Sequence, residues 1–142
     1  MAVPSVLILD DDVAVRRLLR VVTERCGIDA DEAATGIECL DLLSRKSYDV
    51  VLLDIAISSA NTSEILAYVR RSARPPAVIV LTALTRWSFV GVDMAAVHCV
   101  VGKPFDPELL AVLIASAATA IYERRARASL QQQQPQAIFF GQ

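Results

Sequence analysis

Four short apolar runs along the chain each end at a polar residue or group of residues. They are Val6–Leu9 before Asp10-Asp11, Val50–Leu53 before Asp54, Val78–Leu81 before Thr82, and Val97–Val101 before Gly102-Lys103-Pro104. Short apolar runs separated by helix-length segments are typical of buried parallel strands. In open α/β sheets the working site lies at the carboxyl ends of the strands, so these polar residues are predicted to converge at one edge.

The segments between the runs predict helices. The first carries apolar residues at three- and four-residue spacing between Asp12, a candidate N-cap, and Gly27, a candidate stop. Further helices are predicted after the cap Thr35, from Asn61 or Thr62 to Arg71, over Thr85–Ala95 in a short or irregular form, and from Asp106-Pro107 to about Ser129. Strands are predicted at Ser5–Leu9, Asp29–Ala33, Tyr48–Leu53, Ala77–Leu81 and Val97–Val101. Five strands alternating with five helices through right-handed crossovers predict an α/β fold, a doubly wound five-stranded parallel sheet in the flavodoxin-like order 2-1-3-4-5.

The length of 142 residues fits one domain, expected at residues 1–128 and followed by a flexible Gln-rich C-terminal tail at 129–142. Arg124, Arg125 and Arg127 would complement the negative end of the last helix. The formal net charge of −2 argues against direct binding of nucleic acid. We expect a cytoplasmic protein with no membrane segment, because no apolar run reaches the ~18 residues of a span and no secretory signal pattern is present.

The acids expected at the sheet edge suggest a site that binds a metal ion. Asp10, Asp11 and Asp54 would repel one another unless a cation joined them, and a shallow carboxylate cluster suits Mg²⁺. An aspartate beside Mg²⁺ can attack phosphorus and form an aspartyl phosphate. Lys103 and Thr82 would supply donors to the phosphoryl oxygens, because phosphoryl transfer depends chiefly on positioning and charge.

These motifs, in this order, resemble the receiver domain of bacterial two-component response regulators. The resemblance covers about Val3 to Ile121, and includes Thr-Ala after the fourth strand and Lys-Pro-Phe after the fifth. It implies that Asp54 accepts a phosphoryl group from a sensor histidine kinase or a phosphotransfer protein. It also implies a cis peptide bond between Lys103 and Pro104.

The same resemblance implies the role of each site residue. The metal ligands would be Asp11 directly, Asp10 through water, Asp54 and the backbone carbonyl of Ala56. Lys103 and Thr82 would hold the phosphoryl oxygens. A movement of Thr82 toward the phosphate would then change the surface formed by the fourth helix, the fifth strand and the fifth helix, which would signal to an effector protein.

Val100, Ala56 and Leu84 bear on how a phosphorylated form would signal and how long it would last. Val100 stands where a switch aromatic is expected, three residues before Lys103. Ala56 and Leu84 stand where side chains tune self-dephosphorylation, and neither can orient an attacking water. We therefore expect no enzyme activity beyond slow self-dephosphorylation, and a long-lived phosphorylated form.

The sequence leaves several functions open. The leading one is a stand-alone receiver that signals through its surface, with a homodimer through the fourth and fifth helices as an option; a shortened regulator is another. A degenerate receiver that binds partners constitutively is favoured by Val100. A haloacid-dehalogenase-type phosphatase would use Asp10 as its nucleophile and leave Asp54 unexplained. The terminal Ile138-Phe139-Phe140 is either a docking peptide or an untidy tail.

Overall fold

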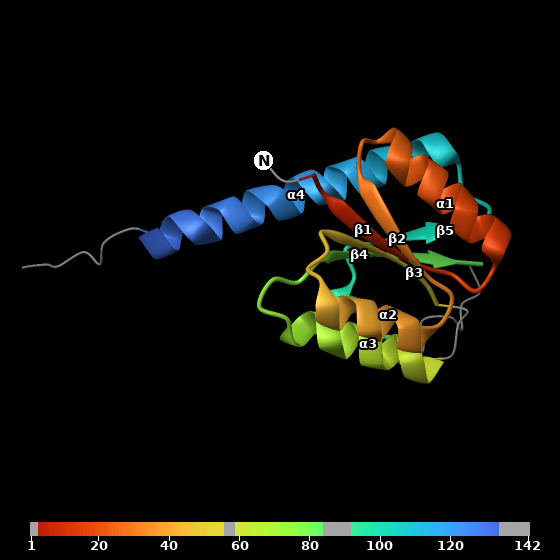
Figure 1. The fold of residues 1–142 in the computed structure, drawn as a ribbon, viewed down its shortest axis with the longest axis horizontal. Coiled ribbons are helices and arrows are strands. Elements are labelled where there is room, and N and C mark those ends of the chain that lie inside the picture. The colour runs from red at the N-terminus through yellow and green to blue at the C-terminus, as the bar shows by residue number, and fades with distance from the viewer. Residues whose placement is uncertain (1–2, 56–58, 84–91, 134–142) are drawn as a thin grey trace, which may run out of the picture.

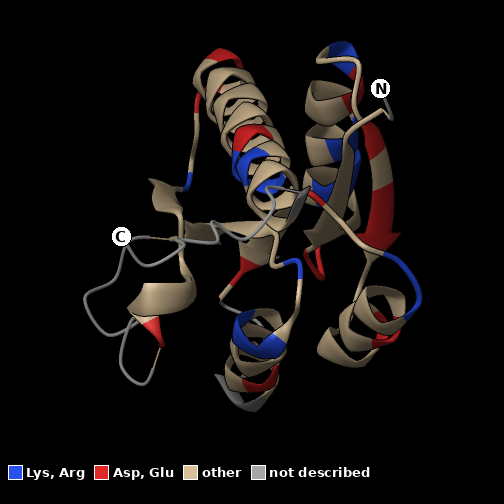
Figure 2. Ribbon diagram, turned by 90° about the vertical axis from the view of Figure 1, so that its left-hand side faces the viewer, with Lys and Arg blue, Asp and Glu red and all other residues tan. Residues whose placement is uncertain are grey.

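The computed structural model describes residues 3–55, 59–83 and 92–133. Its sheet has five parallel strands, β1 (Ser5–Leu9), β2 (Asp29–Ala33), β3 (Val50–Asp54), β4 (Ala77–Thr82) and β5 (Cys99–Gly102). They lie side by side in the order β2-β1-β3-β4-β5, which confirms the predicted strand order (Figure 1). The edge strand β2 carries three acids, visible as the red strand in Figure 2, and charge on an edge strand discourages pairing with another chain.

Four α-helices are present in the described residues: α1 (Val13–Arg25), α2 (Gly36–Arg45), α3 (Ser59–Arg71) and α4 (Pro107–Gln133). Helices α1 and α4 cover one face of the sheet, and α2 and α3 cover the other (Figure 1). Side chains alternate along each strand, so Val6 and Ile8 pack under α1 and α4 while Leu7 and Leu9 pack under α2 and α3. Because both faces are covered, the central strands β1, β3 and β4 are continuous apolar runs followed by polar residues.

Local signals place several helix ends where the sequence predicts them. The Asp12 carboxylate accepts hydrogen bonds from the backbone N–H groups of Ala14 at 2.8 Å and Val15 at 3.2 Å. Thr35 caps α2, and Gly27, with φ of 74°, follows α1. These contacts confirm the predicted caps and the predicted stop. Each joins residues that are close together in the sequence, which is why local patterns predict them.

Other boundaries differ from prediction. Helix α3 begins at Ser59, which places Asn61 and Thr62 inside the helix rather than at its cap. Strand β3 begins at Val50 rather than at Tyr48, whose carbonyl accepts a hydrogen bond from Arg125. Strand β5 begins at Cys99, because the Val97 N–H closes a short 3-10 helix, η2 (Met94–Ala96).

The last helix is longer than predicted. Helix α4 has 27 residues and runs to Gln133, so the first residues of the expected tail are helical. Residues 129–134 contain neither Gly nor Pro, so no helix-breaking residue ends α4 before Pro135. The second half of α4 extends beyond the sheet (Figure 1). Most of the helix expected at 85–95, and residues 134–142 of the expected tail, lie outside the described residues.

Candidate functional site

The acids predicted to converge do so at the carboxyl edge of the sheet. Asp10 follows β1 directly and Asp54 ends β3, and these two strands are neighbours. Ligand oxygens of Asp10, Asp11 and Asp54 all lie within 4.8 Å of one another. Asp10 and Asp54 are buried, at 0% and 2% exposure, whereas Asp11 is exposed. The cluster therefore has two buried carboxylates behind one that faces solvent.

Lys103 brings a positive charge to this cluster from the end of β5. Its Nζ donates to Asp10 Oδ2 at 2.9 Å and lies 3.3 Å from Asp54 Oδ2. Burial by itself would lower the pKa of Lys103, but the hydrogen bond to Asp10 and the charges of Asp54 and Asp10 outweigh it and raise the pKa. The lysine is therefore held in its charged form between the two buried acids.

The backbone around Asp10 is held in place by a second set of contacts. Asp10 Oδ1 accepts a hydrogen bond from the Asp12 N–H at 2.9 Å, and the Asp10 carbonyl accepts one from Arg16 at 2.8 Å. Arg16 is held in turn by Glu32 on β2 at 3.1 Å. Arg16 was not among the residues predicted for this site; its signal in the sequence is an arginine in the first turn of a helix that follows an acidic turn.

The donor set fits Mg²⁺. All three candidate side-chain ligands are carboxylate oxygens, the donors that this hard cation prefers. Three carboxylates face one ammonium, so the cluster keeps an excess of negative charge that a divalent ion would balance. The exposure of Asp11 suits an ion that keeps several of its waters.

The remaining predicted residues have mixed outcomes. Thr82 is buried at the carboxyl end of β4, opposite Gly102, and its carbonyl accepts a 2.6 Å hydrogen bond from the Lys103 N–H. Thr82 thus shares the edge with the cluster. The peptide bond before Pro104 is cis, as the resemblance implied. Val100 lies on β5 with 36% of its surface exposed, while Ala56 and Leu84 lie outside the described residues.

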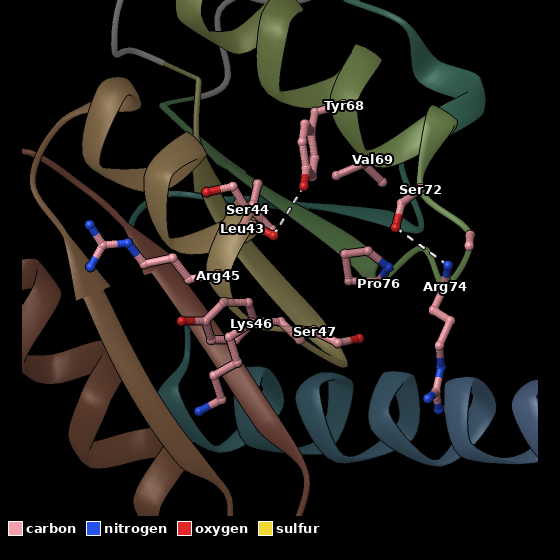
Figure 3. Close-up of a pocket in the computed structure, with 12 residues that line it drawn as sticks. Leu43, Ser44, Arg45, Lys46, Ser47, Tyr68, Val69, Ser72, Arg74 and Pro76 are labelled. Atoms are coloured by element: carbon pink, nitrogen blue, oxygen red, sulfur yellow. Dashed lines mark hydrogen bonds between the residues drawn. The ribbon is translucent and has the colours of Figure 1, made fainter.

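A separate pocket opens at the opposite, amino edge of the sheet. Its volume is about 310 Å³, and it lies between the last turns of α2 and α3, just before β3 and β4 begin (Figure 3). Tyr68 spans it by donating to the Leu43 carbonyl at 3.2 Å. It contains none of the acids described above. The hollow and the acidic chemistry are therefore at different ends of the molecule.

The sequence of the chain matches the family model of the response regulator receiver domain over residues 6–115. The chain belongs to the response regulator receiver family. It is 36% identical over 112 residues to the transcriptional regulatory protein CpxR homolog of Haemophilus influenzae, which covers 75% of this chain and 47% of that protein. It is also 28% identical over 135 residues to the transcriptional regulatory protein SrrA of Staphylococcus aureus, covering 94% of this chain and 54% of that protein.

Solved receiver structures agree with this assignment. A response regulator receiver protein from Burkholderia phymatum is 29% identical, with a TM-score of 0.69 over 82% of this chain and 95% of that one. A CheY-like receiver domain from Methanospirillum hungatei, 21% identical, has the same fold with a TM-score of 0.77 over 87% of this chain and 99% of that one. The predicted family and the flavodoxin-like receiver fold are therefore confirmed.

The chain spans about half the length of the curated relatives named above. Those relatives are titled transcriptional regulatory proteins, so the expectation that this chain makes no contact with nucleic acid stays a prediction. Among the helices of the described residues, none has the length and apolar character needed to cross a membrane.

Proposed function

We propose that this chain is the phosphoacceptor of a two-component phosphorelay and takes a phosphoryl group onto Asp54. The observation that carries the proposal is the position of the Asp54 carboxylate. It is buried at the end of β3, 3.3 Å from the Lys103 ammonium and within 4.8 Å of the oxygens of two further acids. A carboxylate in such a setting can act as a nucleophile toward phosphorus while a cation balances the charge.

In the proposed reaction, a carboxylate oxygen of Asp54 attacks the phosphorus of a phosphohistidine. The new P–O bond forms as the P–N bond breaks, and the donor imidazole leaves with the electron pair and takes up a proton. Lys103 and Thr82 donate to the phosphoryl oxygens as these arrive at the sheet edge. The buried Asp10 keeps Lys103 charged and oriented through the hydrogen bond at 2.9 Å.

We assign the Mg²⁺ ligands to Asp11, Asp54 and the carbonyl of Ala56, with Asp10 acting through water. The metal would supply positive charge to the phosphoryl oxygens during transfer. The oxygen-only cluster of carboxylates supports this assignment, whereas Ala56 lies outside the described residues and enters through the family resemblance.

The proposed partners follow from the family. The chain would be cytoplasmic, and its phosphoryl donor would be a sensor histidine kinase or a phosphotransfer protein. An effector protein would bind the surface predicted for the fourth helix, the fifth strand and the fifth helix, of which the structure describes β5 and α4. Leu109 and Val112 on α4 are 54% and 63% exposed, which supports a protein contact there, a homodimer included. Val100 lies on this surface at the position where the family has an aromatic switch residue. We therefore expect Asp54 to be phosphorylated still, but the usual coupling of that phosphorylation to this surface to be weakened.

The phosphorylated form should persist. Ala56 and Leu84 stand at the two positions that tune self-dephosphorylation, and neither side chain can orient a water for attack on the phosphoryl group. Any release of phosphate would then be slow and would not make the chain an enzyme in its own right. A decay half-life of only seconds on a Phos-tag gel would contradict this part of the proposal.

The test is intact-mass analysis after incubation with Mg²⁺ and acetyl phosphate. Wild-type protein should gain the mass of one phosphoryl group, and Asp54→Ala should gain none. Asp12→Asn is a matched control, because it removes a neighbouring negative charge while asparagine still caps α1. This variant should be phosphorylated like wild type.

Two other results would contradict the proposal. An adduct that persists in Asp54→Ala would place the phosphoryl group elsewhere. A folded wild-type protein that gains no adduct from acetyl phosphate or from a phosphorylated kinase would favour the degenerate receiver, a constitutive binding module. Membership of the receiver family argues against the phosphatase alternative, because receiver domains are signalling domains.

A further inference from the structure

A groove of about 290 Å³ lies at the amino edge of the sheet, at the other end of the molecule from Asp54. The far half of α4 forms one wall and the loop between α3 and β4 forms the other. Three arginines and two neutral polar residues line it together with four apolar residues: Arg74, Arg124, Arg125, Ser129, Gln132, Ala73, Pro75, Ile121 and Ala128. No aspartate or glutamate is among these lining residues.

One of the three arginines fixes the shape of the groove. The Arg125 guanidinium pairs with Asp49 and donates to the Tyr48 carbonyl at 3.0 Å and to the Arg74 carbonyl at 3.1 Å. These contacts tie α4 to β3 and to the loop before β4. Its Nε is buried and has no hydrogen-bond partner in the part of the chain that the structure describes. These contacts therefore fix the position of Arg125 in the floor of the groove, where Asp49 balances its charge.

The other two arginines are exposed and unpaired. Arg74 extends from its loop toward α4 (Figure 3), and Arg124 stands on α4 itself. Within residues 3–55, 59–83 and 92–133, no carboxylate pairs with either guanidinium. Both charges act on Arg125: burial lowers the pKa of Arg125 most, Asp49 opposes this, and the charges of Arg74 and Arg124 lower the pKa further.

The end of the helix does not account for these cations. The sequence analysis assigned Arg124 and Arg125 to the negative end of the last helix, but α4 continues to Gln133 and has no basic residue in its last turn. The field of a helix end fades within about one turn. Arg124 is more than two turns from Gln133, so an electrostatic role at the helix end is excluded.

We propose that this groove binds a small organic anion that carries a phosphate or carboxylate group. Arg74 and Arg124 contact the anionic group from opposite walls, because a guanidinium offers several donors that match such oxygens. Pro75, Ile121 and Ala128 contact the apolar part of the ligand. The volume is at the lower end of the range for small-molecule pockets, roughly 300–1,000 Å³, which suits a ligand of about the size of a nucleoside monophosphate.

The groove is separate from the phosphoacceptor site. The acids of that site end β1 and β3, whereas the arginines of the groove precede β4 or lie on the far half of α4. Binding of the anion would hold α4 against the α3–β4 loop without using Asp54. The proposal therefore does not depend on phosphorylation.

The experiment is isothermal titration calorimetry at low salt in EDTA, which removes Mg²⁺ from the phosphoacceptor site. The probes are inorganic phosphate, adenosine monophosphate and citrate, which separate a phosphate source from a carboxylate source. Arg74→Gln and Arg124→Gln should each weaken binding by at least about tenfold, the loss expected when a charge-assisted hydrogen bond disappears. Arg127→Gln is the matched control, because Arg127 is exposed on α4 but does not line the groove, and it should bind like wild type.

Asp54→Ala should also keep the affinity of wild type, which distinguishes this groove from the site on the opposite edge. Saturable binding of any probe with this pattern of variants supports the proposal. Equal weakening in Arg127→Gln would show diffuse attraction to basic residues and overturn it. The absence of saturable heat for all three probes at millimolar concentration would overturn it as well. Circular dichroism spectra of the exposed Arg74 and Arg124 variants check that they are folded.

Discussion

Replacing Lys103 with methionine tests the electrostatics of the acidic edge. The substitution keeps the length of the side chain and removes the charge that faces two buried acids, with Nζ 2.9 Å from Asp10 Oδ2 and 3.3 Å from Asp54 Oδ2. Removing one partner of a buried ion pair costs about 3–5 kcal/mol, because the other charge stays buried. The lysine side chain is 24% exposed, which places the expected loss at the lower end, about 3 kcal/mol.

Urea unfolding followed by circular dichroism, in EDTA, measures this loss. Lys46→Met is the matched control, since Lys46 pairs with Asp31 at 3.4 Å while both side chains are largely exposed, and such a pair is worth about 0–1 kcal/mol. Added Mg²⁺ should restore part of the stability of Lys103→Met, because the acids regain a cation. A loss below about 1 kcal/mol, or one equal to that of Lys46→Met, would refute the reasoning.

The pH dependence of the same variant follows from the raised pKa of Lys103. A group whose pKa is raised by folding contributes stability that is complete below its ordinary pKa, here 10.5, and is lost as the pH rises through the folded value. The difference in unfolding free energy between wild type and Lys103→Met should therefore stay constant at neutral and mildly alkaline pH. It should narrow above pH 10.5. A difference that grows in that range would contradict the assignment.

Three further substitutions test the packing around the sheet. Gly36→Ala should destabilise the protein by about 1–3 kcal/mol in urea unfolding, because the new Cβ would clash with the Asn61 side chain. Asn61→Gly removes that clash at some cost in helix stability, so the two losses should be less than additive, and additive losses would contradict the contact. Asp12→Ala should lower the melting temperature through a loss of about 1 kcal/mol, whereas Asp12→Asn should not. Arg125→Met should cost about 2 kcal/mol, because the partly buried Asp49 loses its cation and keeps only the hydrogen bond from the Ser5 N–H; a loss below about 1 kcal/mol would show that the pair is solvated.

Features that depend on neighbours along the chain were predictable. The apolar runs gave the strands, since a strand covered on both faces must be apolar throughout. Asp12, Thr35 and Gly27 act on backbone groups within a few residues, so their roles as caps and stop follow from local chemistry. The convergence of Asp10, Asp54 and Lys103 was also predictable, because parallel strands present their carboxyl ends at one edge.

Boundaries set by distant contacts were not predictable in this way. Just before β3, the Tyr48 carbonyl accepts a hydrogen bond from Arg125, which is 77 residues away in the sequence. The start of β5 depends on a 3-10 turn that uses the Val97 N–H. The start of α3 and the length of α4 were also misjudged, since polar residues such as Asn61 and Gln131 are tolerated inside helices as well as outside them.

The sequence by itself determined the order of the strands, the acidic edge and the family, because these rest on hydrophobic period and on motifs at strand ends. Only the tertiary structure decided which residues surround those motifs. It placed Arg16 where its guanidinium donates to the Asp10 carbonyl, and it brought Arg74 into the same groove as Arg124 and Arg125. The physical reason is that such contacts join elements far apart in the chain, and a side chain carries no local sign of the partner that packing will give it.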